Sequence, residues 1–313
     1  MSDLINRFQL QPYRGRKTRY RCPKCGVPHS FARYVDVTTG QELSSEFGYC
    51  NRREKCGYHN PPSHEYLKEY TKGSSSIITK EDVLPEYIAP TGTSYLDPRT
   101  VIMLGGQYDD HLTTFLNGVF GPQRVYPILS RYHVGSIENW GDKATVFWQI
   151  DDEYKVRTGK IMLYDPKTGK RVKEPYNKIN WLHNPWHSLL NENVDDYALR
   201  QVFFGTHLIN QREGTINIAE SEKTAIINSI HKPNSTWLAT GGLELINEEK
   251  LEPLKGRKLV FFPDKGEAYN KWLEKLEPFR CDFDIEVSDF LEKQDMELGE
   301  DIGDYILKLW QKQ

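Results

Sequence analysis

The stretch Thr215–Ile230, TINIAESEKTAIINSI, joins a short apolar strand to a helix through one acidic residue, Glu220. Alternation of apolar residues predicts a strand over Thr215–Ala219. The apolar stripe formed by Ala225, Ile226 and Ile230 predicts a helix over Ser221–Ile230. A strand that leads directly into a helix begins a strand–helix–strand unit, in which the two strands run parallel.

The same alternation continues to the end of the sequence. Further strands are predicted at Thr236–Ala239, Leu259–Phe262 and Asp282–Val287, and helices after Gly241-Gly242, over Ala268–Leu276 and over Asp301–Trp310. Short apolar strands separated by helices indicate a parallel sheet covered on both faces. The expectation for residues 200–313 is therefore a parallel α/β domain.

Acidic residues and glycines follow the first three of these strands. Glu220 comes after the first strand, Gly241-Gly242 after the second, and Asp264 after the third. Ligand sites in such sheets lie beyond the carboxyl ends of the strands, so Glu220 and Asp264 predict a magnesium site for phosphoryl chemistry. The structural alternative is that the two carboxylates only cap the helices that follow them.

The segment before this domain has a different pattern and is basic. Helices are predicted over Asp110–Leu116 and Gln123–Tyr132, followed by a hairpin of Thr145–Ile150 and Lys155–Tyr164. Residues 155–181 hold 8 Lys and Arg against 2 Asp and Glu, which suits contact with phosphates. The predicted phosphate-binding residues are Arg157, Lys160, Lys170 and Arg171.

Two readings of the hairpin stay open, because an ordinary solvated hairpin is also basic. The tryptophans of this region could stack on nucleic-acid bases, although core packing is their commoner role. They are Trp140, Trp148, Trp181 and Trp186.

Four cysteines near the N-terminus form two close pairs, Cys22/Cys25 and Cys50/Cys56. Two short knuckles that each supply two thiolates predict a tetrahedral zinc site. The strands expected between the pairs, over Phe31–Val37 and Glu46–Tyr49, complete a zinc ribbon. A closed site of four thiolates leaves no open position, so the predicted zinc is structural.

A glycine follows each pair, where the backbone turns toward the ligand sulfur. These glycines are Gly26 and Gly57. One alternative stays open, in which His29 or His59 replaces one of the cysteines as a ligand.

Composition limits the class of protein. The chain has 313 residues and a formal net charge of −3. Residues 1–62 nevertheless hold 11 Lys and Arg against 5 Asp and Glu, so positive charge is concentrated in the N-terminal segment. No apolar stretch approaches the roughly 20 residues of a membrane helix, and the first residues lack the apolar core of a signal peptide. The expectation is a cytoplasmic protein without membrane contact. The segment Lys72–Ser76, KGSSS, predicts a flexible linker.

Together these parts resemble the Toprim-domain DNA primases of bacteria, phages and mobile elements. The resemblance lies in INIAESEKTAI (216–226), WLATGG (237–242), KLVFFPDKGE (258–267) and DIGDYIL (301–307). In that family the matching glutamate and acidic motif bind magnesium, which implies Glu220 and Asp264 as catalytic ligands of Mg²⁺ or Mn²⁺.

The resemblance implies four segments: a zinc ribbon over residues 1–62, a linker over 63–93, a primase-like basic α+β subdomain over 94–199 and a Toprim-like domain over 200–313. It also implies that single-stranded DNA, nucleotides and a replicative helicase are partners. The implied activity is nucleotidyl transfer on a single-stranded template during replication of a mobile element.

The sequence departs from the Toprim pattern at both acidic motifs. Ser221 follows Glu220 where a glycine is usual, and Lys265-Gly266 follows Asp264 where the second aspartate of Asp-x-Asp is expected. Losing a carboxylate and gaining a cation weakens a site for hard divalent ions. Glu267 could replace the missing carboxylate only if the loop reshapes, and the further candidates to complete the site are Asp289, Asp301 and Asp304. Two alternatives therefore stay open: a DNA- or partner-binding module without catalysis, and a Toprim nuclease.

Overall fold

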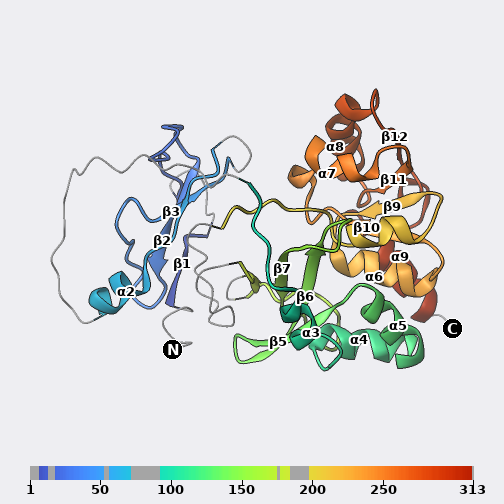
Figure 1. Ribbon diagram of the computed structural model, residues 1–313, viewed down its shortest axis with the longest axis horizontal. Helices are drawn as coiled ribbons and strands as arrows, with labels where there is room; N and C mark the ends of the chain where they lie inside the picture. The colour runs from blue at the N-terminus through green and yellow to red at the C-terminus, as the bar shows by residue number, and fades with distance from the viewer. Residues whose placement is uncertain are drawn as a thin grey trace. The chain divides into compact units, whose positions relative to one another are not determined.

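The computed structural model describes residues 7–12, 18–52, 56–71, 92–174, 177–183 and 197–311 (Figure 1). They belong to two compact units, residues 1–88 and residues 89–313. The linker predicted over residues 72–76 and Trp186 lie outside the described ranges. Within those ranges, no helix has the length and apolar character needed to cross a membrane.

The first unit is built on an antiparallel sheet with strand order β1-β2-β3-β4. Its elements are β1 (Phe8–Leu10), β2 (Phe31–Asp36), β3 (Gly48–Cys50), β4 (His59–Asn60) and α2 (His64–Thr71). After β2 the chain turns at Gly40, whose N–H donates to the Asp36 carbonyl at 2.7 Å. One buried cluster combines Phe31 and Tyr58 with the cysteines, and further apolar residues of this unit are also buried: Phe8, Tyr34, Val35, Leu43 and Leu67. The predicted zinc ribbon is confirmed as a fold.

The second unit contains an antiparallel sheet with order β5-β6-β7-β8. Its strands and the preceding helices are α3 (Pro98–Leu104), α4 (His111–Phe120), α5 (Pro122–Arg131), β5 (Gly135–Asn139), β6 (Asp142–Ile150), β7 (Val156–Met162) and β8 (Ile179–Trp181). Asp110 caps α4 by accepting the N–H of Thr113 at 3.1 Å. At the β6–β7 turn the Asp151 carboxylate accepts the N–H groups of Glu153 and Lys155, which closes the hairpin.

The same unit contains a parallel sheet with order β10-β9-β11-β12. Its elements are β9 (Ile216–Ala219), α6 (Glu222–His231), β10 (Thr236–Ala239), α7 (Glu248–Leu251), β11 (Lys258–Phe262), α8 (Glu267–Leu276), β12 (Asp284–Val287) and α9 (Ile302–Gln311). Short 3-10 helices lie at Thr206–Gln211, Leu243–Leu245, Glu252–Leu254, Glu277–Phe279 and Leu291–Lys293. The predicted parallel α/β architecture is confirmed.

Helices cover both faces of the parallel sheet. One buried cluster joins Ala219 and Ala239 of the strands to α6 and α9. The other joins Ile218 and Phe261 to α7 and α8, with Trp272 wholly buried at its centre. Because neither face of β9 or β10 meets water, both strands are short and apolar, as the sequence pattern indicated.

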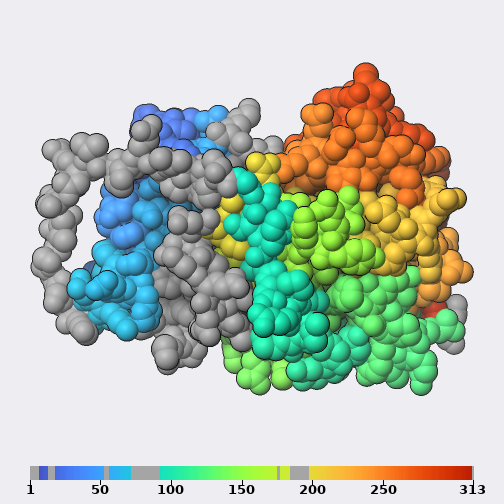
Figure 2. Space-filling model, viewed as in Figure 1, coloured from blue at the N-terminus to red at the C-terminus, as the bar shows by residue number. Residues whose placement is uncertain are grey.

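The two sheets of the second unit share a core. Phe147 of β6 and Met162 of β7 lie in the same buried cluster as Ile226 of α6. In Figure 2 the surface of the β6–β7 hairpin runs without a break into that of the residues that follow position 200. The hairpin is therefore held against α6, at the end of the sheet where β9 passes into that helix.

Candidate functional site

The four cysteines bring their sulfur atoms together in the first unit. The Sγ atoms of Cys22 and Cys56 are 3.7 Å apart, those of Cys25 and Cys50 are 4.0 Å apart, and all four lie within 4.8 Å of one another. Tetrahedral coordination with zinc–sulfur bonds of about 2.3 Å places neighbouring sulfurs about 3.8 Å apart. The donor set and spacing fit a structural zinc ion.

The knuckles have the local geometry that zinc ligands need. Gly26 and Gly57 both have positive φ, at 66° and 62°, which lets the backbone turn around the sulfurs. The N–H of Val27 donates to the Cys25 thiol and lowers its pKa to about 6, whereas burial raises the pKa of Cys22 to about 12. A zinc ion would hold both as thiolates.

The histidines considered as alternative ligands do not join the four cysteines. In the described residues, the group of closely spaced ligand atoms contains only the cysteine sulfurs. The ring of His59 shares a hydrogen bond of 3.0 Å with the Tyr34 hydroxyl and lies edge-on to Tyr49. His59 therefore contacts tyrosines of the ribbon and lies outside the metal site.

In the second unit, Glu220 and Asp264 follow neighbouring strands. Ala219 at the end of β9 pairs with Phe262 at the end of β11, so the loops that carry the two acids leave the sheet side by side. The order β10-β9-β11-β12 places β9 and β11 where the direction of strand addition reverses. Ligands bind at such switch points, outside the carboxyl ends of the strands.

Two further acids join this edge from the start of α9. The Thr224 hydroxyl of α6 donates to Asp301 Oδ2 at 2.5 Å. Asp301 and Asp304 each accept the backbone N–H of the other, at 3.2 Å and 2.9 Å. From the sequence, Asp289, Asp301 and Asp304 are all candidates to complete the site, with no rule that places them; in the structure Asp289 pairs with Lys293 at 2.7 Å.

Electrostatics shows that these acids act on one another. The pKa of Asp264 is raised to about 7, first by burial and then by the negative charges of Asp301, Glu220 and Asp304. Burial also raises the pKa of Glu220, while the Lys160 charge lowers it. Among the described residues, the cysteines are grouped as ligands for one metal ion and these carboxylates are not. Carboxylate oxygens are nevertheless the donors that Mg²⁺ and Mn²⁺ prefer.

The residues that replace the usual second aspartate have structural roles of their own. The Lys265 ammonium donates to the Gln294 carbonyl. Gly266 has a φ of 99°, and its N–H donates to Glu292 at 2.8 Å. Glu267, a candidate replacement for the missing carboxylate, is 90% exposed and pairs with Lys271. The site thus contains one carboxylate on this loop, at Asp264.

We call the edge that carries Glu220, Asp264, Asp301 and Asp304 the acidic edge. A buried ion pair connects the basic hairpin to helix α6 beside it. Lys160 Nζ donates to both carboxylate oxygens of Glu222, at 2.8 and 3.1 Å, and both side chains are buried. Gly241 lies against this pair. If residue 241 had a side chain, its Cβ would be 3.5 Å from Glu222 Oε1 and 3.8 Å from Lys160 Nζ. The sequence predicted Lys160 as a phosphate ligand and gave no signal for Glu222, which lies 62 positions away.

The other predicted phosphate ligands differ in their surroundings. Arg157 is paired with the buried Asp151 at 2.7 Å. Lys170 is exposed, and Arg171 is close enough to lower the pKa of Glu220. Lys160 and Arg171 therefore lie near the acidic edge, whereas Arg157 is bound to Asp151 at the hairpin turn. Nucleic-acid binding by all four stays a prediction.

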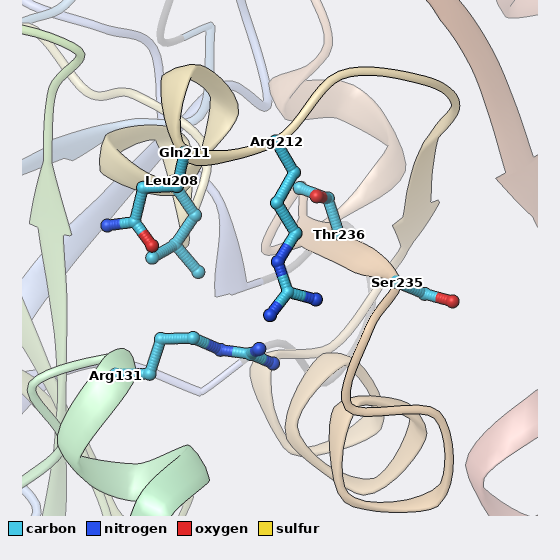
Figure 3. Close-up of a pocket in the computed structure, with 6 residues that line it drawn as sticks. All are labelled: Arg131, Leu208, Gln211, Arg212, Ser235 and Thr236. Atoms are coloured by element: carbon cyan, nitrogen blue, oxygen red, sulfur yellow. The ribbon is translucent and has the colours of Figure 1, made fainter.

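A separate surface pocket lies at the other end of the parallel strands (Figure 3). It is small, with a volume of about 10 Å³, and is lined by Arg131, Leu208, Gln211, Arg212, Ser235 and Thr236. Arg131 and Arg212 both donate to the Pro233 carbonyl, at 2.6 and 2.8 Å. Thr236 is the first residue of β10, so this pocket opens away from Glu220 and Asp264.

Two family models match the chain. Residues 6–72 match the model described as a zinc beta-ribbon finger, which agrees with the four-cysteine site. Residues 110–265 match the model described as "Domain of unknown function (DUF6371)". No match was found among curated proteins.

Several solved structures are distantly similar. The primase fragment of the bacteriophage T7 primase-helicase protein has 12% identity and a TM-score of 0.39, over 86% of this chain and 88% of that chain. The RNA polymerase domain of Mycobacterium tuberculosis primase DnaG has 11% identity and a TM-score of 0.43, over 68% and 78%. A DNA primase domain from Pseudomonas aeruginosa has 14% identity and a TM-score of 0.33, over 62% and 58%.

Proposed function

We propose that this protein is a primase-like nucleotidyltransferase of the Toprim type, which joins nucleotides on a single-stranded DNA template during replication of a mobile element. The observation that carries the proposal is the placement of Glu220 and Asp264 on adjacent strand ends, with Asp301 held beside them through Thr224. A divalent ion held by these carboxylates would neutralise the charge that develops during phosphoryl transfer.

The chain's own residues supply the other parts of such a site. Lys160, which is paired with Glu222, and Arg171 lie near the acids, and Arg171 would meet phosphates of the nucleotide or template. Lys170 extends this charge along the exposed part of the hairpin. The zinc ribbon would engage the template, and a replicative helicase would be the protein partner.

The direct test is incorporation of labelled ribonucleotides on single-stranded DNA with Mg²⁺ or Mn²⁺. We expect Glu220→Gln and Asp264→Asn each to lower the rate by about 100-fold or more, the effect of removing one preorganised electrostatic contributor. DNA binding in magnesium-free buffer should persist in both variants. Glu267→Gln is the matched control, because Glu267 is exposed and should leave the rate unchanged. Equal rates in the wild type and Glu220→Gln would refute the proposal.

A second candidate function is a binding module that does not catalyse transfer. The observation that favours it is Gly266, which stands at the second acidic position with a positive φ and leaves the loop with one site carboxylate. Incorporation absent with both metals, while DNA is still bound, would select this function. Shortening of the template in the same reactions would instead select the nuclease.

A further inference from the structure

One face of the β7–β8 edge bears a row of aromatic rings. Lys160 of β7 pairs in register with Trp181 of β8, and its ammonium lies 5.9 Å from the centre of that ring. Trp181 lies 5.6 Å from the ring of His183, and His183 stacks on Tyr197 at 5.7 Å. We call Trp181, His183 and Tyr197 the ring row.

Hydrogen bonds fix the ring row to β7. His183 Nδ1 shares a hydrogen bond of 2.6 Å with the Thr158 hydroxyl, and the Tyr197 hydroxyl donates to the Arg157 carbonyl at 2.7 Å. Thr158 and Lys160 are two positions apart on one strand, so they share a face. The ring row therefore follows β7 away from Lys160.

Trp181 is placed differently from the other tryptophans of this region. Trp148 is wholly buried, and Trp140 packs against the same hydrophobic cluster. Trp181 is half-buried and lies against Lys160 and His183. Core packing therefore accounts for Trp148 and Trp140, whereas Trp181 contacts a cation and another ring.

A cation lies at each end of the ring row, and each cation is also paired with an acid: Lys160 with Glu222, Arg157 with Asp151 and Lys155 with Glu153. At one end Lys160 reaches Glu222 beside the acidic edge. At the other end Arg157 and Lys155 lie over the ring of Tyr95, at 5.0 and 5.4 Å. A row of rings suits a single strand, because successive bases stack on aromatic faces.

We infer that the ring row stacks successive bases of a single-stranded nucleic acid and leads the strand to the acidic edge at Lys160. The inference rests on the proposed function for the identity of the acidic edge, and it assigns the substrate track of that site. Stacking is tolerant of sequence, since every base presents a flat face. The track therefore accepts a strand without reading its bases.

The test measures binding of fluorescent oligo(dT) and oligo(rU) in buffer without magnesium or nucleotides. Trp181→Leu keeps an apolar side chain but removes the ring, and it should weaken binding by about 5- to 150-fold. Trp181→Phe keeps a ring and should bind nearly as tightly as the wild type. The matched control is Trp310→Leu, which removes a half-buried tryptophan with Arg124 over its ring but outside the ring row. The two oligonucleotides show whether DNA or RNA is the preferred strand.

Two further readouts separate stacking from loss of fold. Addition of oligo(dT) should quench tryptophan emission in the wild type, and the quench should be smaller in Trp181→Phe although that variant still binds. The salt dependence of binding should be the same in Trp181→Leu as in the wild type, whereas Lys170→Ala should reduce the slope. Wild-type affinity in Trp181→Leu, or an unchanged quench in Trp181→Phe, would overturn the inference.

The result of the binding test does not depend on whether the protein catalyses nucleotide transfer. If Trp181→Leu weakens binding but no incorporation occurs in any variant, the stacking track stands and the transferase proposal fails. If incorporation requires Glu220 but Trp181→Leu binds as the wild type does, the transferase stands and the stacking track fails.

Discussion

His207 is a histidine enclosed by other side chains in the second unit. Its Nε2–H donates to the Arg131 carbonyl at 3.2 Å, and its ring is bordered by Tyr132, His133 and Tyr154. Burial lowers the pKa of His207 to about 4, with a smaller contribution from His133. The folded protein therefore keeps this imidazole neutral at pH values where the unfolded chain protonates it.

The sign of the pH dependence follows from this difference. Between about pH 6.5 and pH 4 the unfolded state binds the proton and the folded state does not, so stability falls as the pH is lowered. We expect His207 to account for about 2 kcal/mol of the loss in unfolding free energy between pH 7.5 and pH 5. Urea unfolding of the wild type and His207→Gln at both pH values measures it. Equal losses in the two proteins would show that His207 does not titrate in this way.

Single residues also show where sequence reasoning succeeds and where it ends. Glu220 and Asp264 were predicted to lie together because parallel strands end at one edge, and the register of β9 with β11 agrees. No such rule predicts the position of Glu222, because its partner Lys160 belongs to another sheet. Long-range pairs of this kind depend on how two sheets dock, which local patterns do not encode.

The ion pair between Lys160 and Glu222 fastens strand β7 to helix α6. The exposed fractions of the two side chains are 10% and 3%. We expect Lys160→Met alone to destabilise the second unit by about 3–5 kcal/mol, because it leaves the Glu222 carboxylate buried without a partner. The double variant with Glu222→Met should recover much of this loss.

Urea unfolding of both single variants and the double variant measures the coupling. Removal of the exposed pair of Lys271 and Glu267 is the control, and it should change stability little. A double variant as unstable as the sum of the two single changes would mean that the two side chains do not act as a pair.

Elements with a clear apolar pattern were predicted well, and strands without one were missed. Strand β10 has the predicted bounds, and α6 and α8 begin within one residue of prediction. Strand β5, Gly135–Asn139, was missed because its glycine, serine and asparagine are poor strand formers. Strand β8 has three residues and exists because β7 is beside it. Pairing with a neighbour, which is a tertiary effect, creates both strands.

The division of the chain into two units predicts separate responses to zinc removal. In the first unit the cysteines lie in one buried cluster with Phe31 and Tyr58, so a bound metal holds together part of a small core. We expect a chelator to unfold the described residues before 72 and to leave the unfolding midpoint of residues 92–311 unchanged. Limited proteolysis with mapping of the cut sites measures both units at once.

Variants give the matching control for zinc. Cys50→Ser should reproduce the effect of the chelator, while Cys281→Ser should not, because Cys281 is exposed and outside the sulfur cluster. Protection of the first unit after elemental analysis shows no zinc would contradict the expectation.

The order of the two sites along the chain has a consequence for protein synthesis. The zinc ligands all lie between residues 22 and 56, whereas the acidic edge needs loops at residues 220, 264 and 301–304. At about 5–20 residues per second, the ribosome completes the cysteines on the order of tens of seconds before Asp301. A nascent chain can therefore capture zinc long before its acidic edge exists. Translation that stops before residue 301 leaves a metal-loaded ribbon attached to a sheet that lacks Asp301 and Asp304.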